Sequence, residues 1–367
     1  MPDSAGAKIK EIDFMDNSKK TLVAMSGGVD SSVAAHLTLS MGHTAIGGTM
    51  RHISMLPLND NTGEDDIVSA QKSCDRLGIE HHVIDLSNEF RKHVVDDFVS
   101  VYLAGKTPNP CIVCNKNIKF GALMDAACGL GCDMLATGHY ARVEKSPSGR
   151  LLLKRAADSE KDQSYMLWTL SQEQLSKVLF PLGKLKKSEV RELAASLSFD
   201  NAQKKDSQDV CFIPDGCYAK FIELYTGKSP TPGDFVDMNG VPIGRHKGII
   251  YYTVGQRKGL GLSLGRPMFV HSKSAEKNTV SICDNEQLFS KRLTAENINL
   301  IAVDSIHRPL KLHAKTRYRQ NPTPATVIQT DNDTIIVEFD EPVRAISPGQ
   351  SVVLYDGDIV VGGGIIK

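Results

Sequence analysis

The sequence feature that most constrains this chain is a glycine-containing loop, Ser-Gly-Gly-Val-Asp-Ser-Ser over residues 26–32. The loop follows the run Thr21–Met25, which predicts a strand, and precedes apolar positions from Val33 to Leu39 whose spacing predicts a helix. Adjacent glycines let the backbone approach a phosphate closely, and the amides at a helix N-terminus favour an anion. The pattern therefore predicts a phosphate-binding strand–loop–helix unit. The alternative is a chance glycine turn at a strand–helix junction.

The residues of the loop narrow the class of phosphate site. Ser26, Ser31 and Ser32 supply hydroxyl donors, and Asp30 is a candidate ligand for a magnesium ion that bridges phosphates. The Gly-Lys-Ser/Thr ending of a Walker A loop is absent from the motif, which argues against a γ-phosphate hydrolase of that class. The loop resembles the pyrophosphate loop of the N-type ATP pyrophosphatases. That resemblance implies cleavage of ATP between its α and β phosphates and use of the AMP half to activate an oxygen.

The first two hundred residues alternate between the patterns of strands and of helices. This alternation predicts an α/β fold with a doubly wound parallel sheet, in which ligands bind at the carboxyl ends of the strands. The expected strands are Thr21–Met25, Ala45–Met50, His82–Leu86 and Asp133–Thr137. The expected helices are Ser32–Met41, Ile67–Leu77, Phe90–Leu103, Ile118–Ala127 and Lys187–Ser196.

The domain organisation follows from length and punctuation. A chain of 367 residues is too long for one ordinary domain, and glycine and proline become denser after about Pro214. We expect a flexible N-terminal extension over residues 1–19 and a catalytic domain over 20–215. A small mixed connector domain over 216–286 and a C-terminal β-barrel over 287–367 would follow.

Composition excludes several classes. Lysine plus arginine equals aspartate plus glutamate at 43 each, so any surface for nucleic acid must be local. The first 20 residues resemble neither a signal peptide nor a transit peptide, and the sequence has no apolar run long enough to span a membrane. Eight cysteines without a secretion signal suggest reduced thiols. We therefore expect a cytoplasmic protein with no membrane partner.

A Cys-x-x-Cys pair forms the second informative segment. Cys111 and Cys114 follow Thr-Pro-Asn-Pro, residues 107–110, whose prolines stiffen an extended loop, and Asn115 or a neighbour is expected to begin the next helix. A thiol near a helix N-terminus with lysines close by should have a lowered pKa. By itself the pair fits a redox pair, half a zinc site or coincidence. Together with Cys211, which lies in a second lysine-flanked segment, it fits delivery of sulfur by two thiols to an ATP-activated oxygen.

From about Lys20 to its end the chain resembles the tRNA-specific 2-thiouridylases, the MnmA/TrmU family. The matching motifs, besides residues 26–32, are 107–110 with Cys114-Asn115, 118–120, 136–140, 161–165, 255–261, 315–319 and 362–366. The resemblance implies an ATP-dependent sulfurtransferase that adenylates the C2 oxygen of the anticodon wobble uridine, position 34, and replaces it with sulfur. It also implies tRNA as substrate, ATP and Mg²⁺ as cofactors, and a sulfur donor such as a cysteine desulfurase or a sulfur relay protein.

The resemblance also implies roles for individual residues. Cys211 would carry a persulfide, and Cys114 would be its partner thiol and nucleophile. Asn109, Pro110 and Cys111 would meet the target base. ATP would be held by Ala24, Met25, Ser26, Gly27, Gly28, Val29, Asp30, Ser31, Met50 and Gly138. The tRNA would be contacted by His139, Lys161, Asp162, Gln163, Arg317, Tyr318 and Gln350.

Two questions of chemistry stay open at this point. One branch of the family has aspartate at the position of Cys111, and that carboxylate has been proposed as an acid or base, so the proton-transfer group of this chain is not identified. Cys111, Cys114 and Cys211 could instead ligate three irons of a 4Fe–4S cluster whose fourth iron binds sulfide. Small buried hydrophobes are expected at the remaining cysteines, Cys74, Cys128, Cys132, Cys217 and Cys283.

The predicted RNA contacts have structural alternatives. Residues 311–319 alternate, and as a strand they would place Lys311, His313, Lys315, Arg317 and Arg319 on one face, suited to phosphates. The alternative is a solvated outer face of the barrel. His139 could be a satisfied core histidine, but its place in a loop at a strand end near the nucleotide site favours a functional role. Without the resemblance, residues 161–163 would be interpreted as plain solvated surface. Two rival functions are an amide-forming pyrophosphatase acting on a small metabolite and a non-catalytic RNA-binding protein.

Overall fold

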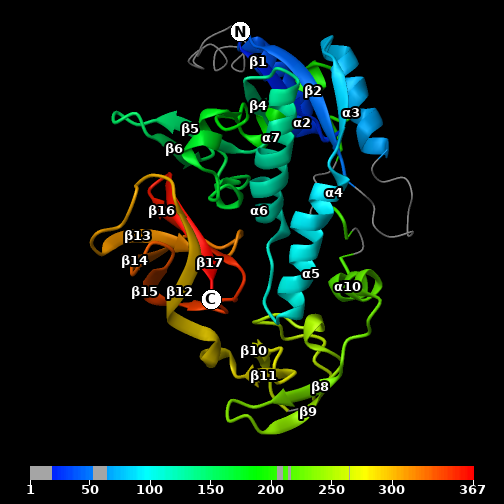
Figure 1. Cartoon of the computed structure of the whole chain (residues 1–367). Coiled ribbons are helices and arrows are strands. Elements are labelled where there is room, and N and C mark those ends of the chain that lie inside the picture. The colour runs from blue at the N-terminus through cyan, green and yellow to red at the C-terminus, as the bar shows by residue number, and fades with distance from the viewer. Residues whose placement is uncertain (1–18, 53–63, 205–209, 214–215, 264) are drawn as a thin grey trace. The chain divides into compact units, whose positions relative to one another are not determined.

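The computed structural model in Figure 1 describes residues 19–52, 64–204, 210–213, 216–263 and 265–367. The chain divides into two compact units. Unit 1 comprises residues 1–93, 112–208 and 358–360, and unit 2 comprises residues 94–111, 209–357 and 361–367. The predicted extension over residues 1–19 lies outside the described part apart from Lys19, as does most of the segment between Lys204 and Cys211. In the described part no helix is long and apolar enough to cross a membrane.

A five-stranded parallel sheet forms the centre of unit 1. Its order is β3-β2-β1-β4-β7, so the chain moves outward in one direction from β1 to β3 and then returns to the other side of β1. The strands are β1 (Lys20–Ala24), β2 (Thr44–Arg51), β3 (His81–Asp85), β4 (Met134–Ala136) and β7 (Val178–Leu179). The reversal between β1 and β4 is a topological switch point, where the carboxyl ends of the strands offer a ligand site.

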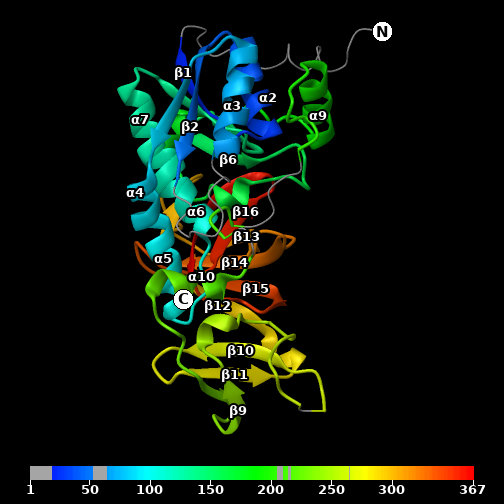
Figure 2. The ribbon, with the colours of Figure 1, turned by 90° about the vertical axis from the view of Figure 1, so that its right-hand side faces the viewer.

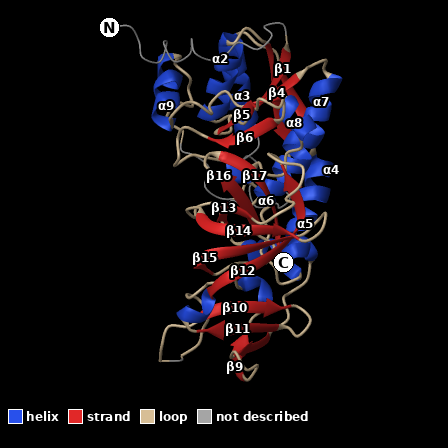
Figure 3. Cartoon of the chain, turned by 90° about the vertical axis from the view of Figure 1, so that its left-hand side faces the viewer, coloured by secondary structure: helices blue, strands red, loops and turns tan. Residues whose placement is uncertain are grey.

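Helices cover both faces of this sheet, which confirms the doubly wound α/β prediction. The helices α2 (Val29–Ser40) and α3 (Glu64–Leu77) pack on one face with α9 (Lys187–Ser196) beside α2, and α7 (Leu123–Gly129) lies on the other (Figures 2 and 3). Val23 of β1 packs with Val33 and Leu37 of α2 in one apolar core cluster, and none of the three has exposed surface. Four strands match the predicted segments within one or two residues, whereas the two-residue β7 escaped prediction.

Two long helical stretches lie between β3 and β4 in the chain. One runs through α4 (Ser87–Phe90), a π-helical segment (Arg91–Val95) and α5 (Asp96–Leu103). The other runs through α6 (Pro110–Cys114), a π-helical segment (Asn115–Ala122) and α7. The second stretch begins at Pro110 and not near Asn115 as predicted, because proline at the first helical position lacks only an N–H that would be unsatisfied there. Other elements are β5 (Ala141–Lys145), β6 (Leu151–Arg155), α8 (Gln172–Ser176) and a 3₁₀ turn (Ser164–Met166).

Unit 2 contains a small mixed α/β part and a barrel. The mixed part consists of α10 (Tyr218–Thr226) and the strands β8 (Gly233–Val236), β9 (Pro242–His246), β10 (Phe269–Ser274) and β11 (Thr279–Cys283), with 3₁₀ turns at Ile249–Tyr251 and Asn285–Leu288. The sheet order is β10-β11-β8-β9. Phe235, Val270, Val280 and Ile282 form its fully buried core.

The C-terminal strands close into a six-stranded barrel, as predicted. They are β12 (Phe289–Leu300), β13 (Leu310–Lys315), β14 (Thr323–Gln329), β15 (Ile335–Arg344), β16 (Ser351–Asp356) and β17 (Ile359–Ile366). The order is β12-β15-β14-β13-β16-β17, and β17 pairs back with β12 from Ala295↔Ile366 to Leu300↔Gly362. Inside the closed barrel, every second residue of a strand points into the core. Examples are Ala325, Val327, Ile335 and Val337, which have no exposed surface.

One strand prediction was wrong in its length. β13 ends at Lys315, and the backbone N–H and hydroxyl of Thr316 both donate to Oε1 of Gln320, which closes a turn. Lys315 is 6% exposed, whereas Lys311 and His313 face solvent. The five basic residues between 311 and 319 therefore do not line one face of a strand, because the turn breaks the two-residue period.

Candidate functional site

The loop between β1 and α2 occupies the switch point of the parallel sheet. The backbone N–H of Met25 donates to the carbonyl of Gly48 in β2 at 2.9 Å, which ties the start of the loop to the sheet. Gly28 has an extended backbone and precedes the first turn of α2. Gly27 has φ +67°, and a Cβ there would lie 2.5 Å from the carbonyl oxygen of Asp66. Only glycine fits this position without displacing the start of α3.

Three side chains hold the carbonyl of Gly27. It accepts hydrogen bonds from Ser69 Oγ at 2.9 Å and Asn201 Nδ2 at 3.2 Å, with Lys204 Nζ at 3.5 Å. Because a trans peptide points its C=O and the following N–H in opposite directions, these donors aim the N–H of Gly28 away from themselves. A phosphate oxygen approaching the loop would find that N–H already oriented. Ser69, Asn201 and Lys204 were missed from the sequence because they lie 42 to 177 positions from Gly27.

The serines of the loop mainly bond to the loop itself. Ser31 Oγ donates to the carbonyl of Gly28 at 2.9 Å and accepts from the N–H and hydroxyl of Ser26 at 3.2 and 3.3 Å. Ser32 Oγ lies 2.9 Å from both Ser73 Oγ and Asn201 Nδ2, and it is fully buried. These hydroxyls fix the shape of the loop from within, a role that the sequence pattern does not distinguish from phosphate binding.

Asp30 is the charged centre of the site. Lys187 Nζ lies 2.7 Å from each carboxylate oxygen of Asp30, and the hydroxyl of Tyr140 donates to Oδ1 at 2.8 Å. The Lys187 side chain is only 10% exposed and that of Asp30 31%, so bulk water screens the ion pair weakly. From the sequence, Asp30 is a candidate magnesium ligand and Lys187 only the first residue of a predicted helix. The fold places an ammonium group beside the phosphate loop.

The remaining predicted nucleotide residues come to the same edge of the sheet. Gly138 follows β4, and a Cβ there would lie 2.9 Å from the backbone carbon of Asp30, so the β4 loop touches the first turn of α2. Met50 lies at the end of β2, half-buried and paired with Ile84 of β3. Parallel strands thus bring residues 24–31, Met50 and Gly138 to one edge of the sheet, and their contact with ATP stays a prediction.

His139 lies in a core position. Its Nδ1 is 2.7 Å from Thr137 Oγ1, and its ring packs against Phe120 and Phe180 with centroids 5.8 and 6.0 Å away. Burial, with the nearby positive charge of Lys119, holds the pKa of His139 well below its usual range, so the imidazole is neutral at pH 7. This geometry favours the alternative of a satisfied core histidine over a direct contact with tRNA.

Residues 161–163 hold backbone groups near Asp30. Asp162 is buried and accepts from the backbone N–H groups of Ala156 and Ser164, at 3.1 and 3.2 Å. Gln163 Oε1 accepts from the backbone N–H of Tyr140 at 2.9 Å, and Tyr140 in turn holds Asp30. Lys161 is half-buried. The alternative of plain solvated surface does not hold for Asp162, which is buried, and the predicted contact of these residues with tRNA stays a prediction.

The three candidate thiols lie in short, defined elements. Cys111 is the second residue of α6 and is exposed, whereas Cys114 ends α6 and is half-buried. Cys211 is exposed within a turn in which the N–H of Ile213 donates to the carbonyl of Val210 at 2.9 Å. Of the three, Cys111 is the thiol at a helix N-terminus. Among the residues that the structure describes, no group of three or more His, Cys, Asp or Glu side chains is arranged to hold a metal ion.

The other cysteines divide into two groups. Cys74, Cys132 and Cys283 are buried, as predicted, and burial raises the pKa of Cys74 to about 12. Cys128 and Cys217 are exposed, so the expectation of burial was wrong for these two. Each lies in a helical or turn segment whose apolar pattern does not specify which face its thiol occupies.

The predicted tRNA contacts of unit 2 make bonds within the protein. Gln350 Nε2 donates to the carbonyls of Thr107 and Pro108, at 3.1 and 2.9 Å, and so holds the loop that carries Asn109 and Pro110. Arg317 Nη2 lies within 3.2 Å of three acceptors, the carbonyls of Val254 and Ala345 and Ser347 Oγ. The ring of Tyr318 lies under Lys315 Nζ at 5.8 Å. These side chains order the surface on which an RNA contact would have to be made.

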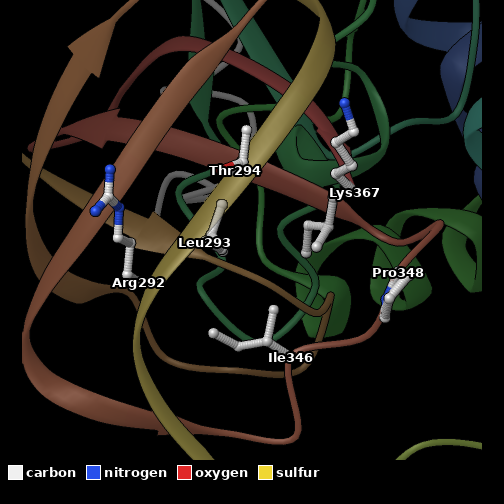
Figure 4. A pocket seen from close by; sticks show the side chains of 7 residues that line it. Arg292, Leu293, Thr294, Ile346, Pro348 and Lys367 are labelled. Atoms are coloured by element: carbon white, nitrogen blue, oxygen red, sulfur yellow. The ribbon is translucent and has the colours of Figure 1, made fainter. Parts of the chain in front are cut away.

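A pocket on the outside of the barrel belongs to none of these groups. Figure 4 shows it between β12 and the turn before β16. Its lining consists of Arg292, Leu293, Thr294, Ile346, Pro348, Ile366 and Lys367. None of the residues predicted to bind ATP, the target base or tRNA lines this pocket.

A glycine substitution tests the loop geometry. Gly27→Ala should abolish ATP binding, because the new methyl group meets the Asp66 backbone and L-residues pay about 1–2 kcal/mol in the left-handed region. The matched control is Gly78→Ala, which has the same φ of +67° but no atom within 4 Å of its Cβ. Isothermal titration with ATP should show binding by the Gly78 variant and none by the Gly27 variant. Equal affinity in the two variants would contradict the close-packed loop.

Comparison with known proteins identifies the family. Residues 19–215 match the model described as tRNA methyl transferase HUP domain, residues 219–284 the tRNA methyl transferase PRC-barrel domain, and residues 290–366 the Aminomethyltransferase beta-barrel domain. The chain is 46% identical over 363 residues to the tRNA-specific 2-thiouridylase MnmA of Clostridioides difficile, which covers 95% of this chain and 98% of that protein.

Further relatives are equally extensive. The MnmA proteins of Lachnoclostridium phytofermentans and Acetivibrio thermocellus are 46% and 44% identical, each over 95% of this chain and 99% of the relative. Among solved structures, the U34-tRNA thiolase NcsA from Methanococcus maripaludis is similar over 60% of this chain and 73% of its own, with 19% identity and a TM-score of 0.37. Because the similarity to the MnmA proteins extends over nearly the whole chain, this chain belongs to the family of tRNA-specific 2-thiouridylases.

Proposed function

We propose that this protein is an ATP-dependent tRNA 2-thiouridylase that converts the wobble uridine, position 34, to 2-thiouridine and releases AMP and pyrophosphate. The observation that carries the proposal is the loop over residues 26–32, in a chain that aligns with the 2-thiouridylases over nearly their whole length. Its Gly28 N–H is oriented by three donors to the Gly27 carbonyl, and an ammonium group stands beside Asp30. These are the groups that binding of a polyphosphate requires.

The first step is activation of the uridine. The C2 oxygen attacks the α-phosphorus of ATP, the bond to the bridging oxygen of pyrophosphate breaks, and pyrophosphate leaves. Charge develops on the leaving group, and the loop N–H groups, the N-terminus of α2 and Lys187 stabilise it. Asp30 is the carboxylate that would hold Mg²⁺, which neutralises phosphate charge when bound with ATP. Tyr140 and Lys187 keep that carboxylate in place beforehand.

The second step is sulfur transfer. The terminal sulfur of a Cys211 persulfide attacks C2, and AMP leaves with the former C2 oxygen. The Cys114 thiolate then attacks the Cys211 Sγ, which breaks the S–S bond to the transferred sulfur and leaves a disulfide between Cys114 and Cys211. The new C2–sulfur bond becomes the thione. A thiol reductant restores both cysteines, and a sulfur donor protein reloads Cys211.

Asn109, Pro110 and Cys111 are proposed to meet the target base, and Lys161, Arg317, Tyr318 and Gln350 to act on the tRNA side. For Gln350 the proposed role is through the loop over residues 107–110, whose carbonyls it binds. The wobble base would leave its stack so that its C2 atom can enter the site, as bases do in enzymes that modify them. The chemistry needs reduced thiols, which fits the expectation of a cytoplasmic enzyme.

Lys187 provides a direct test of the activation step. Lys187→Met should reduce tRNA-dependent pyrophosphate release at least tenfold, because Asp30 loses both 2.7 Å contacts and the loop loses its ammonium group. Lys187→Arg should retain part of the rate, since the charge remains. Lys184→Met, an exposed lysine three residues away, is the control and should behave as wild type. A normal rate in Lys187→Met would contradict the assigned role.

The sulfur route is tested by a single-turnover assay on anaerobically purified protein with ATP, Mg²⁺, a persulfide donor and unmodified tRNA. On the persulfide route, iron-free wild type forms 2-thiouridine, and Cys114→Ser and Cys211→Ser lose at least a hundredfold. Cys111→Ser stays active, as does the exposed control Cys128→Ser. The alternative route through a 4Fe–4S cluster predicts that thiolation tracks bound iron and needs all three cysteines.

The same assay separates the rival functions. An amide-forming pyrophosphatase would exchange pyrophosphate into ATP without tRNA, and a non-catalytic RNA-binding protein would bind tRNA without releasing AMP. Formation of 2-thiouridine with stoichiometric AMP contradicts both.

A further inference from the structure

An aromatic cluster lies within unit 2, next to Cys211. It consists of Phe98 and Tyr102 on α5, of Tyr218, Phe221 and Tyr225 on α10, and of Phe212. Figure 1 shows α5 and α10 side by side, and the ring contacts join them. The proposed adenylation and sulfur transfer do not use the rings of this cluster.

Phe212 joins the cluster through one ring on each helix, Phe98 on α5 and Phe221 on α10. Its ring centroid is 5.4 Å from that of Phe98 at an interplanar angle of 87°, and 5.3 Å from that of Phe221 at 60°. Edge-to-face and tilted pairs at these separations are the favourable aromatic geometries. Phe212 is 8% exposed and Ile213 1%, although both lie in a short turn with no regular secondary structure. The turn is therefore anchored by side-chain packing.

Cys211 is the exposed residue on this anchored turn. The N–H of Ile213 donates to the carbonyl of Val210, so the turn closes around Cys211 and Phe212. One side chain faces solvent and its neighbour is inserted between two helices. A buried ring directly after an exposed thiol limits the positions that the thiol can reach.

The helix that receives Phe212 also leads to the predicted base-contacting loop. α5 ends at Leu103, and the chain continues through residues 104–108 to Asn109 and Cys111. That segment is fixed by the backbone of unit 2: the N–H of Thr107 donates to the carbonyl of Pro348 at 2.8 Å, and Gln350 binds the next two carbonyls. α5 thus connects the turn of Cys211 to the loop of Asn109 within one compact unit.

We propose that Phe212 is a positioning residue for sulfur transfer: inserted between α5 and α10, it holds Cys211 at a fixed place relative to the loop that carries Asn109 and Cys111. The inference rests on the proposed function for its purpose, although the anchoring itself is independent of it. Sulfur transfer requires reacting atoms about 3–3.5 Å apart, so an anchored thiol reaches C2 far more often than one on a loose turn.

The anchoring is tested by a distance measurement in the full-length chain. Spin labels are placed on Cys211 and on α5 through Leu103→Cys, at a residue that is 48% exposed. The other partly or fully exposed thiols are removed by Cys111→Ser, Cys114→Ser, Cys128→Ser and Cys217→Ser. Pulsed electron paramagnetic resonance should give a narrow distribution with Phe212 present. Phe212→Ala should broaden it at least twofold and Phe212→Leu partly.

The purpose of the anchor is tested in the native-cysteine background. Phe212→Leu and Phe212→Ala should lower the ratio of 2-thiouridine formed to pyrophosphate released, at least tenfold in Phe212→Ala, while pyrophosphate release stays within twofold of wild type. Phe235→Leu is the matched control, since Phe235 is fully buried in the β8 core away from the cluster. It should change neither the ratio nor the distance. Thermal melting identifies the variants that fold. If Phe212→Ala does not fold, the comparison of Phe212→Leu with wild type still tests the proposal.

The outcomes separate the two proposals. An unchanged distance distribution, or an unchanged ratio in a variant whose distribution has broadened, overturns the positioning role. If wild type forms no 2-thiouridine, the proposed function fails, and the anchoring is decided by the distances alone.

Discussion

The Asp30 carboxylate and its two donors are the interaction on which the rest of the nucleotide site depends. Lys187 comes from the start of α9 and Tyr140 from the segment after β4, so one carboxylate joins three elements that follow different strands. The Lys187 side chain is mostly buried and that of Asp30 partly so, and loss of either partner of this ion pair would leave the other charge poorly compensated. Around it, Asp162 and Gln163 shape the turn of Tyr140, and Gly138 lets that segment touch α2. Removing any one of these contacts would shift the loop that must meet the phosphates.

Unit 2 holds short segments that have no regular secondary structure. The loop over residues 106–110 is fixed by Pro348 and Gln350, and the turn of Cys211 by the insertion of Phe212. The barrel has a buried apolar core and α5 buries Phe98 and Tyr102, so both can support the segments that carry reactive groups. Gln350, which the family resemblance assigns to tRNA, orders the first of these segments, whereas Arg317 binds the carbonyls of Val254 and Ala345.

The sequence predictions failed where a local turn, a helix start or the face of a thiol was not specified by the pattern. The period of two over residues 311–319 predicted a basic strand, but the Thr316–Gln320 bonds end the strand, and Lys315, its last residue, is buried. The helix of Cys114 begins at Pro110, four residues before the cysteine, because proline suits the first helical position. Cys128 and Cys217 are exposed although their neighbours are apolar, since a lone thiol does not reveal its face.

The sequence by itself determined the alternation of strands and helices, the glycine loop after β1, the barrel at the end of the chain and the motifs that identify the family. These are local or periodic signals, and they survive because burial of apolar faces enforces them. Only the tertiary structure decided that Lys187 and Tyr140 share Asp30, that Asn201 and Ser69 orient the Gly27 carbonyl, and that Phe212 fills the space between α5 and α10. Such pairs lie up to 174 positions apart, and no local preference specifies which polar or aromatic groups the sheet order and helix packing bring into contact.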